Sequence, residues 1–98
     1  MESPSELDGT GVILYTQNDG RGSYGLVYYE DEDRKEDITA LAICKYPNDQ
    51  EVYLFACNRF WNIIGDTLHD SIDAAKEFAE EYYEASDIQW HKKDNDML

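Results

Sequence analysis

The sequence is organised around residues 40–57, which read ALAICKYPNDQEVYLFAC. Two apolar segments, Ile38–Tyr46 and Glu51–Asn58, are separated by Pro47-Asn48-Asp49-Gln50. Pro, Asn and Asp form turns readily, whereas Val, Ile, Tyr, Phe and Leu in short runs between turns are typical of buried strands. We therefore predict an antiparallel β-hairpin over these residues.

The turn sets the register of this hairpin. If Tyr46 faces Glu51, then Cys44 lies opposite Tyr53 and Cys57 lies opposite Ala40. Strand side chains alternate between the two faces of a sheet. One face then carries Leu41, Ile43, Val52, Leu54 and Ala56, and the other carries Ala40, Ala42, Cys44, Tyr46, Tyr53, Phe55 and Cys57. Because both faces are apolar, we expect these strands at the centre of the sheet.

A helix is predicted after Gly65, where apolar residues recur at spacings of three and four. This stripe consists of Ile72, Ala75, Phe78, Ala79 and Tyr82. Such spacing places the residues on one side of an amphipathic helix. Asp70 or Ser71 can accept hydrogen bonds from the N–H groups of its first turn. We expect the stripe to pack on the aliphatic face of the hairpin.

The remaining segments give weaker signals. A second hairpin is predicted from the strands 11–16 and 24–29 around the Gly-rich loop 17–22, and Phe60–Ile64 is predicted as a short fifth strand that Gly65 ends. The run 30–37, EDEDRKED, lacks an apolar anchor and is expected to be a solvated loop. Residues 1–10 are expected to be a flexible leader and 91–98 a flexible tail, with Ile88-Gln89-Trp90 packing back on the body.

These elements predict a single α+β domain over residues 11–90. Its sheet is mainly antiparallel, with four to five strands, and one long helix packs on one face. The 98 residues suit one domain. Disorder is excluded because 42% of residues are hydrophobic and 13% are aromatic, enough for a compact core.

The charge is strongly negative, with 8 Lys+Arg against 22 Asp+Glu and a formal net charge of −14. Direct binding to nucleic-acid phosphates is excluded because that affinity comes from Lys and Arg that displace counterions. Anionic membrane surfaces repel such a chain for the same reason. No apolar run approaches the ~20 residues of a membrane span, and the N-terminus lacks the pattern of a signal peptide. We expect a cytoplasmic protein.

No residue pattern points to catalysis, a metal or a cofactor. Cys44 and Cys57 are too far apart along the predicted hairpin for a disulfide and lack zinc-ligand spacing, so we expect two reduced cysteines that pack in the interior. His69 lies near Asp66 and Asp70, but no nucleophile can be placed beside it. The acidic run 30–37 lacks the Gly of a calcium loop, and Gly20-x-Gly22 lies in a turn rather than before a helix. The sequence predicts a protein that is not an enzyme.

The charge excess instead favours a basic protein partner. Small domains usually carry a net charge of magnitude ~2–8, and the repulsion between further like charges costs folding stability. Complementary charge steers association, and aromatic side chains supply binding energy. The predicted partner-binding carboxylates are Glu30, Asp31, Glu32, Asp33, Glu36, Asp37, Glu77, Glu80, Glu81 and Glu84, with Tyr28, Tyr29 and Trp61 as aromatic anchors.

Residues 65–90 carry a further pattern: Gly65-Asp66-Thr67-Leu68-His69 precedes a Ser-capped helix with small residues and a terminal aromatic, and Trp90 follows. This segment resembles small acidic bacterial proteins, some of which look like immunity proteins that neutralise a toxin domain encoded in the same genome. The resemblance implies a strand followed by a helix. It also implies a non-enzymatic inhibitor that occludes a basic site on a toxin such as a nuclease.

Three alternatives remain open at this stage. A phage-type inhibitor could imitate nucleic-acid phosphates with its carboxylates and bind a host nuclease or a defence complex. A small-ligand binder or enzyme could use the Cys/Tyr/Phe face of the sheet, which would require a concave pocket there. A homo-oligomer could use the same apolar face for self-association.

Overall fold

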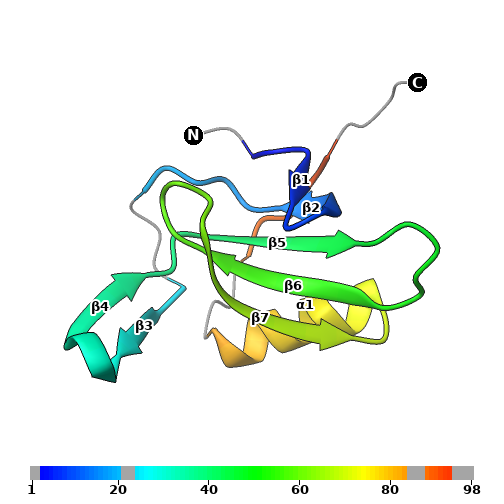
Figure 1. The fold of residues 1–98 in the computed structure, drawn as a ribbon. Coiled ribbons are helices and arrows are strands. Elements are labelled where there is room, and N and C mark those ends of the chain that lie inside the picture. The colour runs from blue at the N-terminus through cyan, green and yellow to red at the C-terminus, as the bar shows by residue number, and fades with distance from the viewer. Residues whose placement is uncertain (1–2, 21–23, 84–87, 94–98) are drawn as a thin grey trace.

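The structure, a computed structural model, describes residues 3–20, 24–83 and 88–93. Its main sheet is antiparallel, and the strands follow the order β1 (Glu6–Leu7), β2 (Thr10–Tyr15), β5 (Ala40–Lys45), β6 (Val52–Cys57) and β7 (Ile63–His69). The short strand β8 (His91–Lys92) also pairs with β2. The helix α1 (Ile72–Tyr82) packs on one face of this sheet (Figure 1). The α+β class, the antiparallel sheet and the single helix on one face are confirmed.

The central hairpin has the predicted register. β5 pairs with β6 so that Ala40 lies opposite Cys57 and Cys44 opposite Tyr53. Both strands are almost entirely buried, since β5 has β2 on its other side and β6 has β7. The apolar character of both faces therefore correctly indicated that β5 and β6 lie at the centre of the sheet.

The helix begins where its cap residue predicts. The Ser71 hydroxyl accepts a hydrogen bond from the Ala74 N–H at 3.0 Å, which satisfies one of the free donors of the first turn. Ala75 and Ala79 are fully buried against the aliphatic face of the hairpin. Ile88 and Trp90 pack against the same cluster, as expected for the segment after the helix.

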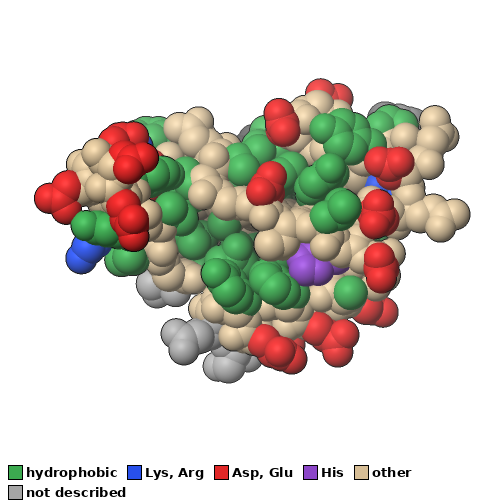
Figure 2. Space-filling model, turned by 60° about the horizontal axis from the view of Figure 1, so that its bottom comes forward, with side chains coloured by type: hydrophobic (Ala, Val, Ile, Leu, Met, Phe, Trp, Pro, Cys, Tyr) green, Lys and Arg blue, Asp and Glu red, His purple; other side chains and the backbone are tan. Residues whose placement is uncertain are grey.

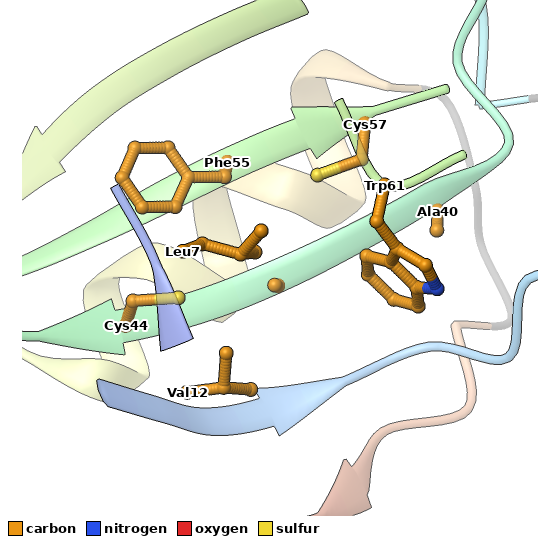
Figure 3. Packing of buried hydrophobic residues seen from close by; sticks show 8 residues of the cluster. Leu7, Val12, Ala40, Cys44, Phe55, Cys57 and Trp61 are labelled. Atoms are coloured by element: carbon orange, nitrogen blue, oxygen red, sulfur yellow. The ribbon is translucent and has the colours of Figure 1, made fainter. Parts of the chain in front are cut away.

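The opposite face of the sheet is a second core. Cys44, Phe55 and Cys57 are buried together with Leu7 from β1 and with Trp61 from the β6–β7 loop (Figure 3). The two cysteines are free thiols, as predicted. Since Leu7 and Trp61 fill the Cys/Tyr/Phe face, these cysteines and Phe55 line packed core instead of the open pocket that a ligand site there would require.

The predicted N-terminal hairpin is wrong. β2 pairs with β5, not with residues 24–29, and Thr16 continues beside β5. Thr16 holds this path, because its N–H donates to the Leu41 carbonyl and its Oγ1 accepts from the Leu41 N–H, both at 2.9 Å. The segment after β2 therefore does not turn back to form a hairpin partner for β2.

The charge run after residue 29 is not a loop. β3 (Leu26–Tyr29) and β4 (Arg34–Asp37) form a separate two-stranded sheet, joined by the 3₁₀ turn η1 (Glu30–Glu32) and by Asp33 with φ 49°. This β3–β4 unit, hereafter the acidic hairpin, projects from one end of the main sheet (Figure 1). Its strands form despite the charges because Val27 lies against the core and the Glu36 carboxylate accepts hydrogen bonds from Tyr29 and Asn58.

Three further boundaries differ from the sequence prediction. Gly65 does not end the fifth strand but lies within β7, opposite Ala56. Glu6–Leu7 belongs to the sheet rather than to a flexible leader, since the Leu7 side chain is buried and covers the second core. His91–Lys92 likewise pairs with β2, and the Lys93 N–H donates to the Ile13 carbonyl, so residues 91–93 do not belong to a flexible tail. The rest of the predicted tail, residues 94–98, lies outside the described residues. No helix in the described ranges has the length and apolar character needed to cross a membrane.

Candidate functional site

The predicted carboxylates form two groups on one side of the molecule. Figure 2 shows acidic side chains on the acidic hairpin and around α1, with hydrophobic side chains gathered between them. The exposed members of these groups are Glu30, Asp31, Glu32, Asp33, Asp37, Glu77, Glu80 and Glu81. Glu36 is partly buried, and Glu84 lies outside the described residues.

Contacts within the acidic hairpin engage some of these carboxylates. Arg34 Nε donates to Glu32 Oε1 at 2.6 Å, a hydrogen bond that raises the pKa of Arg34. The Tyr28 hydroxyl donates to Asp33 Oδ1 at 2.9 Å, while its ring stays half-exposed. Glu32 and Asp33 therefore help to shape the tip, and the hairpin offers its remaining charge through Glu30, Asp31 and Asp37.

Glu36 holds the hairpin to the main sheet. Its Oε2 accepts from Asn58 Nδ2 at 2.7 Å, and its Oε1 accepts from the Tyr29 hydroxyl at 3.2 Å. Burial and this hydrogen bond raise the pKa of Tyr29, and the Arg34 guanidinium lies 4.2 Å from the centroid of the Tyr29 ring. Glu36 and Tyr29 thus have structural contacts, and their assignment to a partner-binding surface stays a prediction.

Asn58 is the centre of a buried polar network that sequence reasoning missed. Its Oδ1 accepts from the N–H groups of Phe60 and Asn62 at 2.9 and 3.0 Å, and its carbonyl accepts from Asn18 Nδ2 at 2.8 Å. This network folds the β6–β7 loop so that Trp61, with φ 64°, is 6% exposed. Trp61 is therefore a core residue and not an anchor for a partner. The sequence signal that could have indicated this network is the position of Asn58 directly after a buried strand.

A groove of about 810 Å³ lies between the acidic hairpin and α1, and polar and apolar surface contribute about equally to its lining. One wall is β3 with the preceding turn, and the other is the exposed side of the helix. Its lining comprises Tyr24, Gly25, Leu26, Val27, Ile38, Ala56, Gly65, Asp66, Thr67, Phe78, Tyr82 and Tyr83. We call this feature the hairpin–helix groove. The sequence did not predict it, because residues 24–29 were assigned to a hairpin with β2.

A second hollow, of about 480 Å³, lies at the other core. Tyr15, Trp61 and Lys93 contribute to its lining. Lys93 Nζ donates to the carbonyl and the hydroxyl of Ser3 at 2.8 and 3.1 Å, so its charge already ties the C-terminal segment to the N-terminal one.

The groups considered for catalysis are not brought together. His69 Nε2 lies 2.7 Å from Thr67 Oγ1, and its ring packs on Phe78 with centroids 4.8 Å apart. Burial lowers the pKa of His69, which Asp70 partly opposes. Burial raises the pKa of Cys44 and of Cys57 to about 12, so neither thiol is an activated nucleophile. Within the described ranges, no three His, Cys, Asp or Glu side chains are grouped for a metal ion.

The chain matches no family model, no curated protein and no solved structure. The resemblance of residues 65–90 to immunity proteins therefore stays a hypothesis.

Proposed function

We propose that this protein is a non-enzymatic acidic inhibitor, of the immunity-protein kind, that binds and occludes a basic site on a protein partner such as a toxin nuclease. The observation that carries the proposal is the exposure of carboxylates on two separate elements, the acidic hairpin and α1, on one side of the molecule (Figure 2). Complementary charges of this kind accelerate encounter and select basic partners.

The contacts of these carboxylates support a binding role. Glu30, Asp31, Glu77 and Glu81 are exposed and form no ion pair or side-chain hydrogen bond with the described residues. They add repulsion to a chain of net charge −14 and gain no local partner in return. A basic partner surface would relieve that repulsion on binding.

The test compares two variants of equal charge. One carries Glu30→Gln, Asp31→Asn, Glu77→Gln and Glu81→Gln; the control carries Glu6→Gln, Asp8→Asn, Asp49→Asn and Glu51→Gln, four exposed acids on β1, its turn and the β5–β6 end. Both variants and the wild type serve as bait in native lysate of the source cell. Each captured protein is then purified, and its activity is assayed with and without the bait.

We expect the wild type and the control to capture a basic protein and to inhibit its activity stoichiometrically, and the first variant to lose both properties. Capture of no basic protein by the wild type would contradict the proposal. Equal losses in the two variants would also contradict it, since the effect would then follow total charge and not this surface.

A further inference from the structure

The hairpin–helix groove is hollow because its floor is built from the smallest residues. Gly65 on β7 lies opposite Ala56 on β6, on the same face of the sheet as the helix. A Cβ placed on Gly65 would lie 3.6 Å from the Ala56 Cβ, an ordinary van der Waals contact. A side chain could therefore occupy this position, but none does, and the floor stays open between the two walls.

The walls expose large apolar side chains to solvent. Leu26 on β3 is 54% exposed and Tyr82 on α1 is 66% exposed, and Phe78 lies one helical turn before Tyr82. Large apolar side chains that are exposed around a groove can form a site of interaction. Aromatic side chains are the type that contributes most to binding at such sites.

Carboxylates stand beside both walls. Asp37 is the direct cross-strand neighbour of Leu26, and residues in such pairs project from the same face of a hairpin. Glu81 follows Phe78 by three residues and is therefore its neighbour on the helix surface. Asp66 belongs to the lining itself, which includes no Lys or Arg among the described residues.

We propose that this groove receives a positively charged peptide segment of the partner that carries a large apolar side chain. The apolar side chain lies over Ala56 and Gly65, between Leu26 and Phe78, while flanking Lys or Arg residues pair with Asp37 and Glu81. This inference rests on the proposed function and specifies where, and by which chemistry, a basic partner is held. A second copy of the chain is disfavoured as the occupant because it would bring another net charge of −14 against the same rim.

The test uses dye-labelled synthetic peptides and fluorescence anisotropy at low ionic strength. The first peptide has a central Trp-Leu pair flanked by lysines and arginines, the second has Ser-Ser in place of that pair, and the third has acidic flanks around Trp-Leu. They are titrated with wild type, Gly65→Val, which fills the floor, and Leu26→Gln. Leu68→Gln is the matched control, because Leu68 is 50% exposed and lies outside the groove lining.

We expect wild type and Leu68→Gln to bind the basic Trp-Leu peptide about tenfold or more tightly than the Ser-Ser peptide, the gain from burying one large apolar side chain. Gly65→Val and Leu26→Gln should lose that preference while melting no lower than Leu68→Gln. A variant with Asp37→Asn and Glu81→Gln should weaken binding of both basic peptides.

Other outcomes separate this inference from the proposed function. Equal binding of the two basic peptides, unchanged by Gly65→Val, overturns the groove assignment but leaves an acidic partner-binding surface intact. Equal binding of the acidic-flanked peptide shows a general apolar pocket and overturns the basic segment as its occupant. Self-association that Gly65→Val abolishes in sedimentation assigns the groove to a second copy and overturns the proposal, whatever the lysate captures show.

Discussion

Asn58 joins the acidic hairpin to the main sheet, since its Nδ2 donates to Glu36 Oε2 over 2.7 Å. The two residues lie 22 positions apart in the chain, one after β6 and the other within β4. The same Asn58 side chain accepts from the backbone of the β6–β7 loop through its Oδ1. One amide therefore sets both the position of the hairpin and the loop that buries Trp61.

Replacing this amide by a carboxylate separates its two roles. Asn58→Asp keeps an oxygen for the Phe60 and Asn62 N–H groups but removes the donor to Glu36 and places two carboxylates together. We expect a loss of about 1.5–3 kcal/mol in the free energy of unfolding at neutral pH, as for a hydrogen bond to a charged group. Urea denaturation followed by tryptophan fluorescence measures it.

Glu32→Gln is the control for that experiment, because its contact with Arg34 is a surface ion pair with exposed partners. Such pairs contribute about 0–1 kcal/mol, so the control should unfold near the wild-type urea midpoint. If Asn58→Asp were as stable as Glu32→Gln, Asn58 would not be the residue that holds the hairpin.

The Ser71 cap predicts a matched pair of helix variants. Ser71→Ala removes the acceptor of the Ala74 N–H, and it should destabilise the protein by about 1 kcal/mol. Ser71→Asp retains an acceptor oxygen and adds a negative charge at the N-terminal end of the helix dipole, so it should be close to wild type. Thermal melts by circular dichroism compare them, and equal melting temperatures for all three proteins would contradict the assigned cap.

The buried thiols should be unreactive in the folded protein. Burial raises the pKa of Cys44 and Cys57 from 9.0 to about 12, so each stays a neutral thiol at pH 8. A chromogenic disulfide reagent should label neither cysteine in native buffer and both in denaturant. Rapid labelling of either residue without denaturant would contradict the packing of the second core.

The same pKa values predict how stability changes with alkaline pH. A group whose pKa is higher in the folded state contributes stability below its unfolded pKa, and that contribution is lost as pH rises. Stability from the thiols should therefore fall from about pH 9 upward, over the interval toward 12. Urea midpoints between pH 8 and pH 10 should decline less in a Cys44→Ala/Cys57→Ala variant than in wild type.

Added salt should stabilise the protein. Like charges oppose folding in a chain of net charge −14, and raising salt from about 0.01 to about 0.1 M shortens the screening length from about 30 to about 10 Å. The melting temperature should rise over this range, and rise less in the variant with Glu30, Asp31, Glu77 and Glu81 neutralised. An unchanged or lower melting temperature at higher salt would contradict the cost assigned to the charge excess.

The central hairpin and the helix could be predicted because their signals are local. Pro47 and its neighbours set a register that then follows by alternation, and Ser71 with its apolar stripe sets a helix within a dozen residues. The partner of β2 could not be predicted in this way. Any neighbouring strand can accept and donate the backbone hydrogen bonds of β2. The pairing with β5 depends on Val12 and Leu14, which pack in cores formed by distant residues.

The candidate site divides in the same manner. Exposure of Glu30, Asp31, Glu77 and Glu81 follows from charge itself, because unpaired carboxylates stay in water. The structural roles of Glu36 and Tyr29 and the burial of Trp61 could not be derived, since each depends on Asn58 or on a loop that Asn58 organises.

The sequence by itself determined an α+β domain with a central apolar hairpin, a Ser-capped amphipathic helix, two reduced cysteines and a large negative charge. These properties depend on residue type and short-range spacing, and such information is local. Only the tertiary structure decided that the run 30–37 forms a hairpin, that Leu7 and Trp61 close the second core, and that a groove opens between Leu26 and Phe78. Those features arise where segments far apart in sequence compete to bury the same apolar surface, and their outcome depends on the packing of the whole chain.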